Sequence, residues 1–246
     1  MPEVDALQLP AVSARLMREL DDIVINRFTL TLEQMMENAG RSLAEVVINE
    51  YHPDSALILA GPGHNGGGGL VCARHLHNRG VRVTVVMARP DRLSPATEHQ
   101  LGVLREMGVS ITDTPLAASV VIDALVGYAL DGEPRGRIST LIDWAREQRG
   151  VVVALDVPSG LDATTGRVST HCIHADVTVT LALPKTGIAI SPHVVGRLYL
   201  ADISIPRAAY AFVGLNVPVV FADASVVRIS AIIDEIRFEE DGQTGP

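Results

Sequence analysis

A run of glycines after an apolar segment is the part of the sequence best suited to hold an anion. Residues 56–60 are apolar and precede Gly61-Pro62-Gly63-His64-Asn65-Gly66-Gly67-Gly68-Gly69-Leu70, after which residues 71–79 have a helical pattern. A strand, a glycine turn and a helix in this order point backbone N–H groups and the positive end of a helix dipole at one anionic group. Glycine allows close approach, and some of these positions are expected to need positive φ. A tight turn without a ligand is the alternative, but consecutive glycines lose much conformational entropy on folding, so we favour a binding loop.

Two aspartates end apolar segments that are predicted to be strands. Asp123 follows residues 120–122, and Asp156 follows residues 151–155 and begins the turn Asp156-Val157-Pro158-Ser159-Gly160-Leu161-Asp162. Carboxylates at such positions serve as general acids or bases, or as ion ligands. The structural alternatives are a helix N-cap for Asp123 and a locally hydrogen-bonded turn for Asp156 and Ser159. We favour the functional interpretation of Asp123, and we expect Asp162 to be a local turn carboxylate.

Other polar groups give weaker signals. Lys185 follows a predicted strand, and its charge suits a bound phosphate or a solvated surface equally well. His171, Cys172 and His174 lie close together, but the segment offers no fourth ligand, so loop packing is favoured over a metal site. Gly61-x-Gly63-x-x-Gly66 matches the dinucleotide-binding fingerprint, although the next strand ends in Met87-Ala88-Arg89 and not in the acid that holds a ribose.

The alternation of strand and helix patterns predicts how these residues are positioned. Helices are expected over residues 11–28 and from Thr31 to about residue 50. Strands are expected at 56–60, 81–87, 109–111, 120–123, 151–155, 176–183, 198–203 and 217–221. This order predicts a single α/β domain over residues 1–246, with a doubly wound, mostly parallel sheet and a frayed tail over about 239–246. Ligands of such sheets bind beyond the carboxyl ends of the strands, so the glycine run, Asp123 and Asp156 are expected to converge.

The composition narrows the function. The chain has 246 residues, of which 47% are hydrophobic and only 4% aromatic, and its formal net charge is −9. This content suffices for one sizeable core of Val, Leu, Ile and Ala, which suits a sheet buried on both faces. The negative charge argues against a general nucleic-acid surface, and the apolar runs are too short to span a membrane. Two cysteines provide no disulfide framework, so a cytoplasmic protein is expected.

Five segments together resemble the YjeF N-terminal domain family, whose enzymes are NAD(P)H-hydrate epimerases. They are Met36-Glu37-Asn38-Ala39-Gly40, residues 60–70, Val121-Ile122-Asp123-Ala124-Leu125-Val126-Gly127, residues 155–162 and Leu183-Pro184-Lys185-Thr186-Gly187. The resemblance implies a Rossmann-like three-layer α/β/α sandwich preceded by N-terminal helices. It also implies an isomerase that interconverts the R and S epimers of NADHX and NADPHX, which are cofactors hydrated on the nicotinamide ring. A dehydratase then repairs the S form.

The same resemblance implies the site residues. Asp123 matches the proposed catalytic acid or base of the family, and a K⁺ ion would be held by Asn65, Asp123 and Ser159. Substrate contacts are implied for three segments: His64, Asn65, Gly66, Gly67 and Gly68; Gly127, Tyr128, Ala129, Leu130, Asp131, Gly132 and Glu133; and Asp156. The chain departs from the family at His64, where Asn is usual, and at Gly68, where Asp is usual. The loss of that carboxylate bears on substrate preference.

Partners and competing functions follow from the same comparison. The resemblance implies a homodimer and a separate dehydratase as the pathway partner, and we expect no nucleic-acid or membrane partner. A non-catalytic YjeF-type domain, used as a nucleotide-binding or dimerisation scaffold, is the alternative, but a scaffold is expected to lose the ion ligands Asn65, Asp123 and Ser159 first. An NADP-dependent oxidoreductase is a third possibility, for which the sequence offers no hydride-acceptor site.

Overall fold

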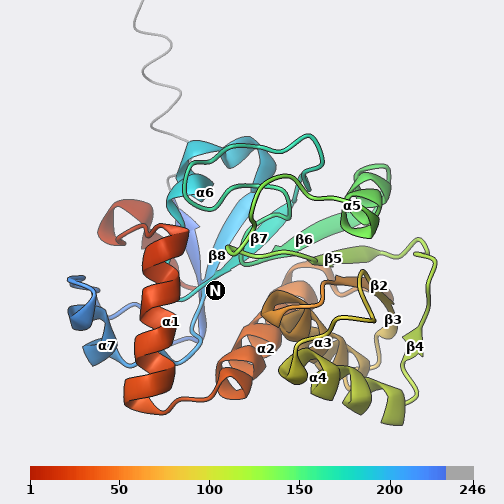
Figure 1. The fold of residues 1–246 in the computed structure, drawn as a ribbon, viewed down its shortest axis with the longest axis horizontal. Helices are drawn as coiled ribbons and strands as arrows, with labels where there is room; N and C mark the ends of the chain where they lie inside the picture. Colours follow the sequence, from red (N-terminus) through yellow and green to blue (C-terminus); the bar gives the residue numbers. More distant parts are fainter. Residues whose placement is uncertain (231–246) are drawn as a thin grey trace, which may run out of the picture.

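Nine strands of residues 1–230, the part of the chain that the computed structural model describes, pair into one sheet (Figure 1). Their order is β1-β9-β8-β7-β6-β5-β2-β3-β4, and β8 and β9 are antiparallel whereas all other neighbours are parallel. The strands are β1 (Glu3–Asp5), β2 (Ser55–Ala60), β3 (Arg82–Met87), β4 (Ser110–Ile111), β5 (Val120–Ala124), β6 (Val151–Leu155), β7 (Val177–Leu181), β8 (Arg197–Ala201) and β9 (Val226–Ser230). The predicted mostly parallel α/β sheet is confirmed.

Helices cover both faces of the sheet because its central strands are apolar on both sides. Alternate residues of β2 face opposite layers: Ile58 belongs to a core shared with α2, α3 and α4, whereas Leu57 and Leu59 pack with α5. The helices are α1 (Ala14–Phe28), α2 (Leu32–Tyr51), α3 (His64–His77), α4 (Pro95–Glu106), α5 (Arg137–Arg146), α6 (Thr186–Ile190) and α7 (Arg207–Phe212). The three-layer sandwich follows directly from this period-2 burial.

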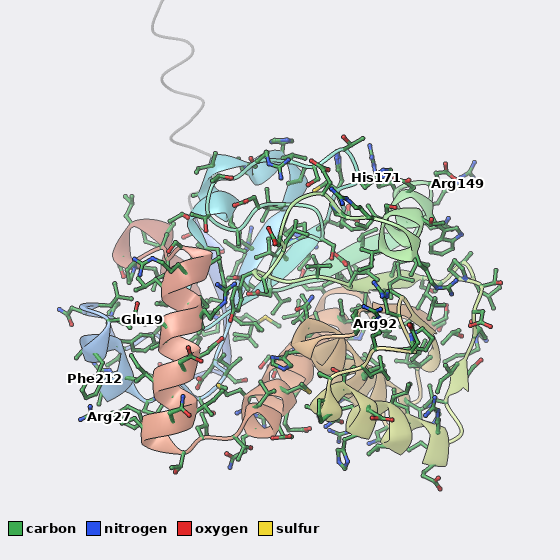
Figure 2. The ribbon with its side chains drawn as sticks, in the orientation of Figure 1. Glu19, Arg27, Arg92, Arg149, His171 and Phe212 are labelled. Atoms are coloured by element: carbon green, nitrogen blue, oxygen red, sulfur yellow. The ribbon has the colours of Figure 1, made fainter. Side chains whose placement is uncertain are left out.

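The second N-terminal helix begins where the sequence predicts, whereas α1 begins three residues later than predicted, because Val12 forms a β-bridge with Lys185. The Ser13 hydroxyl caps α1, and Thr31 and Gln34 form a reciprocal capping box at the start of α2. α1 packs against α7, where the Arg27 guanidinium lies 3.8 Å from the centroid of the Phe212 ring (Figure 2). These helices form a wall beside the carboxyl ends of the central strands.

The C-terminal part of the sheet differs from the prediction. Residues 217–221 do not form a strand; Pro218 cannot donate a ladder hydrogen bond, and Val217 instead packs among side chains of α1 and α7. The last strand is β9, which pairs with the short β1 through Glu3 opposite Arg228. A three-residue strand has too little pattern to predict. The predicted frayed tail at 239–246 lies outside the described residues.

None of the helices within residues 1–230 combines the length and apolar character needed to cross a membrane.

Candidate functional site

The glycine run lies inside a helix and not in a turn before it. α3 begins at His64, so the four glycines from Gly66 to Gly69 occupy its first turns, and no residue of the run has positive φ. The predicted need for positive φ is therefore wrong. Close approach is the reason for glycine: a Cβ on Gly66 would lie 1.9 Å from the Gly61 carbonyl oxygen, and one on Gly69 would lie 2.4 Å from the Ala124 Cβ. The glycines let α3 sink onto the ends of β2 and β5.

This packing puts the N-terminus of α3 at the point where the sheet reverses its winding. The chain leaves β2 towards β3 on one side and returns to β5 on the other, and the Gly61 N–H donates to the Ala124 carbonyl across the two strand ends at 2.9 Å. The N-cap residue Gly63 has no capping side chain, so the first N–H groups of α3 remain available to a ligand. Open parallel sheets bind ligands in this crevice.

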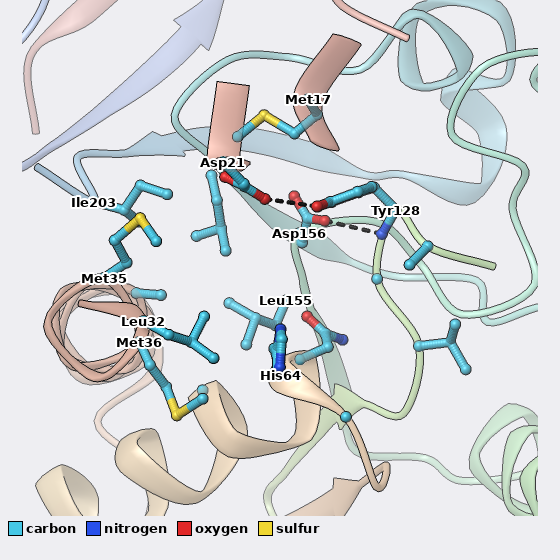
Figure 3. A pocket seen from close by; sticks show the side chains of 18 of the residues that line it. Met17, Asp21, Leu32, Met35, Met36, His64, Tyr128, Leu155, Asp156 and Ile203 are labelled. Carbon is cyan, nitrogen blue, oxygen red and sulfur yellow. Dashed lines mark hydrogen bonds between the residues drawn. The ribbon is translucent and has the colours of Figure 1, made fainter. Parts of the chain in front are cut away.

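A cavity of about 440 Å³ opens beside the α3 N-terminus (Figure 3). One side is polar and includes Asn65, Tyr128, Asp156 and Lys185. The opposite wall is apolar and comes mainly from the N-terminal helices: Met17, Leu32, Met35, Met36, Ala39 and Ile203. An apolar enclosure with a few convergent polar groups is the usual form of a small-molecule site.

Asp156 and Lys185 form a buried ion pair on the polar side of the cavity. The Lys185 ammonium contacts the Asp156 carboxylate and also donates to the Leu181 carbonyl at 2.8 Å, and its side chain is fully buried. The alternative of a solvated surface lysine is therefore wrong: the residues after β7 turn inward towards the cavity. The other oxygen of the Asp156 carboxylate accepts the Tyr128 N–H at 3.0 Å.

The backbone of Asp156 is strained. Its φ is +71°, a left-handed conformation that non-glycine residues adopt at a cost of roughly 1–3 kcal/mol. Such strain persists only where the surroundings hold the residue in place. It orients the carboxylate into the cavity.

Asp123 is placed differently. Its carboxylate is completely buried, is not part of the cavity lining, and accepts three hydrogen bonds: from the Ser159 hydroxyl at 2.6 Å, the Ser159 N–H at 2.7 Å and the Leu125 N–H at 3.2 Å. Burial raises the pKa of the Asp123 carboxyl to about 6, against the opposing effect of these donors. The structure thus brings Asp123 and Ser159 together, but one layer behind the cavity surface.

The donor atoms around Ser159 fit a hard cation. The Ser159 hydroxyl accepts from the Val126 N–H at 2.8 Å and lies 3.0 Å from the Val126 carbonyl oxygen, so carboxylate, hydroxyl and carbonyl oxygens converge. The nearby Asn65 side chain has a buried amide nitrogen without a hydrogen-bond partner. Buried amide atoms are normally paired, and rotating this amide would present its oxygen in place of the nitrogen. Oxygen donors of these three kinds are the ligands that a K⁺ ion prefers.

The loop after β5 reaches the cavity only at its start. Gly127, Tyr128 and Ala129 line the cavity, and a Cβ on Gly127 would lie 3.0 Å from both Asn65 Oδ1 and Asp156 Oδ2. Leu130, Asp131, Gly132 and Glu133 do not line it. Glu133 instead pairs with Arg167 at 2.6 Å and accepts the Thr170 N–H, which anchors the far end of the loop.

The glycine segment contributes unevenly to the cavity. His64, Asn65 and Gly68 line it, whereas Gly66 and Gly67 face the packed interior. A Cβ on Gly68 would lie 2.9 Å from a methyl group of Leu155, the residue before Asp156. The departure from the family at position 68 therefore falls on the cavity surface.

Two weaker sequence predictions have clear outcomes. Asp162 is a turn carboxylate, as predicted, because its oxygen accepts the N–H groups of Thr164 and Thr165. His171 Nδ1 lies 2.8 Å from Asp143, and the Cys172 side chain is buried, which is the expected loop packing.

Sequence reasoning missed Asp21 of α1, which lines the cavity. Its carboxylate accepts the Tyr128 hydroxyl at 2.6 Å (Figure 3). A signal was present: Asp21 lies four residues after Met17 and three before Val24, so it shares the apolar face of α1. A carboxylate on such a face requires a partner.

The fold and the site define an open α/β protein with a cavity of small-molecule size at the switch point of its sheet. Residues 32–187 match the family model described as YjeF-related protein N-terminus. The chain belongs to this family.

Several relatives extend the match over nearly the whole chain. A Dehalogenimonas lykanthroporepellens protein named NAD(P)H-hydrate epimerase is 40% identical over 89% of this chain and 93% of its own length. A Truepera radiovictrix protein of the same name is 35% identical over 83% and 94%. A Hyperthermus butylicus protein named bifunctional NAD(P)H-hydrate repair enzyme Nnr is 42% identical over 74% of this chain, which spans only 36% of that protein.

A solved yeast structure, YNL200c, has the same fold. It superposes with a TM-score of 0.79 and 24% sequence identity, covering 90% of this chain and all of the yeast chain. The likeness supports the three-layer architecture with N-terminal helices.

Proposed function

We propose that this protein is an NAD(P)H-hydrate epimerase, which interconverts the R and S forms of NADHX and NADPHX. The observation that carries the proposal is the buried Asp156–Lys185 pair, which faces a cavity beside the open N-terminus of α3. Relatives named for this activity match nearly full length. The proposal makes the protein an isomerase of cofactor repair.

Substrate binding divides between the two sides of the cavity. The diphosphate lies at the N-terminus of α3, where the N–H groups of His64, Asn65 and Gly66 face an anion without an intervening side chain. Gly127 and Ala129 contact the hydrated nicotinamide end, near Asp156. The apolar wall from α1 and α2 excludes water from the reacting ring.

The reaction inverts a ring carbon that carries a hydroxyl group next to the ring nitrogen. A route through loss of water and a route through ring opening both need a group that gives a proton and takes it back. Asp156 and Lys185 form an ion pair within the cavity, beside the loop that we assign to the nicotinamide end, so we assign proton transfer to this pair. Asp123, which the resemblance suggests as the catalytic residue, is instead assigned to ion binding, because its carboxylate does not reach the cavity surface.

A K⁺ ion held by Asn65, Asp123 and Ser159 would add positive charge close to the diphosphate and keep the Asp123 carboxylate ionised. The oxygen donors around Ser159 support this site. The Ser159 N–H donates to Asp123, and the Val126 N–H donates to the Ser159 hydroxyl. An ion bound by Asp123 and Ser159 would therefore also fix the two turns that contain Val126 and Ser159, which lead to the residues that hold the substrate.

The partner proposals rest on chemistry and on the longer relatives. The bifunctional relatives suggest that a dehydratase consumes the S epimer, and here we assign that step to a separate protein. A homodimer stays a prediction. Cys72 and Cys172 are buried free thiols, which suits the reducing cytoplasm.

A coupled assay tests the proposal. Purified protein is added to (R)-NADPHX, an S-specific dehydratase, ADP and KCl, and recovery of NADPH absorbance at 340 nm is compared with the spontaneous rate. The expected result is acceleration that scales with protein concentration. Absence of acceleration with both NADHX and NADPHX, from protein that is folded by circular dichroism, rejects the epimerase and favours the non-catalytic scaffold.

A further inference from the structure

Asp21 and Tyr128 join the N-terminal helix to the proposed reaction centre. The Tyr128 hydroxyl donates to Asp21 at 2.6 Å, and the Tyr128 backbone N–H donates to Asp156 at 3.0 Å, so one residue bonds in two directions (Figure 3). Its ring also lies 5.9 Å from the Lys185 ammonium. The position of the loop after β5 is thereby tied to α1 at one end and to the Asp156–Lys185 pair at the other.

A purely structural role does not account for the charge of Asp21. A buried tyrosine hydroxyl needs an acceptor, but a neutral amide or a backbone carbonyl would already satisfy it, although with a weaker bond than a carboxylate makes. A carboxylate here costs stability: burial raises the pKa of Asp21 to about 6, and the negative charges of Asp156 and Asp22 act in the same direction. The Tyr128 hydrogen bond and Lys185 only partly offset these effects.

We propose that Asp21 is a positioning residue of the epimerase site, whose ionised carboxylate holds Tyr128 and, through the Tyr128 N–H, aligns Asp156 with Lys185. This inference rests on the proposed function. It assigns α1 a direct part in the reaction: the helix closes the cavity over the ring and sets the orientation of the proton-transfer pair.

The charges around Asp21 determine how the Asp21–Tyr128 hydrogen bond responds to pH. From α1 itself it has Arg18 near the Tyr128 ring and Asp22 next to it; from the sheet side it faces Tyr128, Asp156 and Lys185. When Asp21 is protonated, it no longer offers a charged acceptor, so the Tyr128 bond weakens to that of a neutral pair. The alignment of Asp156 is then lost below the pKa of Asp21.

The test compares wild type with Asp21→Asn, Tyr128→Phe and the control Asp22→Asn, which changes the neighbouring exposed carboxylate of the same helix. At pH 8 we expect Asp21→Asn and Tyr128→Phe each to lower kcat roughly 10-fold with little change in KM, because phosphate contacts at α3 persist. The double variant should lose no more than either single one. Near pH 5 the Asp21→Asn and wild-type rates should converge, since both side chains are neutral. An active wild type with an unchanged rate and pH profile in Asp21→Asn overturns the inference.

A second measurement does not depend on epimerase activity. Chymotrypsin cleaves after Tyr and Phe alike, so limited digestion reports on access to the bond after residue 128 in all four proteins. We expect faster cleavage there in Asp21→Asn and Tyr128→Phe than in wild type and Asp22→Asn, as measured by mass spectrometry. Equal cleavage in all four proteins overturns the inference. Loosening of the loop in a protein without epimerase activity would instead reject the proposed function alone.

Discussion

Asp123 and Asp156 lie near the carboxyl ends of the neighbouring strands β5 and β6, yet the fold gives them opposite surroundings. Asp123 is sealed behind the cavity surface and is held by uncharged donors from Ser159 and Leu125. Asp156 lines the cavity in a strained conformation and pairs with a buried ammonium group. Part of the difference is register: Asp123 lies within β5 opposite Ala154, whereas Asp156 lies two residues further along, just beyond the end of β6. Packing of α3 and of the loop after β5 then covers the first carboxylate and leaves the second at the cavity.

The largest expected effect is that of Asp156→Asn. Loss of the ionisable carboxyl should lower kcat by roughly 10²–10⁴-fold, the usual contribution of a positioned acid or base. Steady-state kinetics in the coupled assay measures this, with the exposed Asp91→Asn as the matched control. If Asp123→Asn loses more kcat at saturating KCl, the two carboxylates have been assigned the wrong way round.

Stability must be separated from chemistry in that variant. Asp156→Asn leaves Lys185 buried without a counter-charge, which costs roughly 3–5 kcal/mol. Adding Lys185→Met removes both charges, and we expect thermal stability to recover while activity does not. Recovery of both would show that the pair serves only the fold.

Asp123→Asn should act mainly through the cation. Replacing one anionic oxygen by an amide weakens the binding of a monovalent cation, and we expect the KCl concentration for half-maximal activity to rise by roughly 10-fold, equivalent to about 1.4 kcal/mol. Titration with KCl at constant ionic strength, using choline chloride as the balance, measures the shift. An unchanged potassium dependence would remove Asp123 from the ion site.

The pH dependence of thermal stability tests Asp123 as an ion ligand, with a smaller expected effect than the two preceding variants. Because the pKa of Asp123 is about 6 in the folded state and about 3.9 in an unfolded chain, the folded state binds its proton more tightly. The stabilisation from this carboxyl is therefore present below pH 4 and is lost as the pH rises through 6. A cation that binds the ionised form should restore roughly 5–10 °C in Tm at pH 8, at 100 times its Kd, and much less at pH 5. An equal KCl effect at both pH values contradicts the site.

The smallest expected effect is that of Gly68→Ala, which tests the surroundings of Asp156 without touching Asp123. A Cβ at Gly68 meets only the flexible end of Leu155, so Gly68→Ala should lower kcat/KM roughly twofold to fivefold by displacing that side chain. Its control is Gly102→Ala in α4, outside the cavity, where a Cβ meets nothing within 4 Å. A change in potassium dependence without a change in kcat/KM would place the effect of Gly68 on the Asp123 side.

Most of the fold could be predicted because its signals are local. Contiguous residues form the apolar runs of β2, β3, β5 and β6 and the capping box of α2. The parallel topology follows from the alternation of these strands with helices. β1 and β9 could not be predicted, because a short edge strand is defined by the partner that it pairs with. The strand expected at 217–221 is absent because its apolar residues pack in other ways: Val217 packs with side chains of α1 and α7, and Val220 and Phe221 pack in a separate cluster.

The sequence predicts which residues form the site, but not how deeply each of them is buried. The convergence of the glycine run, Asp123 and Asp156 follows from topology. Nothing near Lys185 in the sequence distinguishes a buried ammonium from a solvated one, because its partner Asp156 lies 29 residues away. Which of the two carboxylates reaches the cavity also depends on the register of β5 against β6 and on how far α3 and the loop after β5 cover each strand end, and neither is written in the local sequence.

The four glycines of α3 also bear on how the protein folds. Glycine is about 1 kcal/mol less favourable than alanine at each helical position, so this helix start has little tendency to form in an isolated chain. It becomes helical only when α2, β2 and β5 are already in place to receive it. We therefore expect the anion-binding end of α3 to form only together with these elements, so that a chain without its packed sheet has no assembled dinucleotide site.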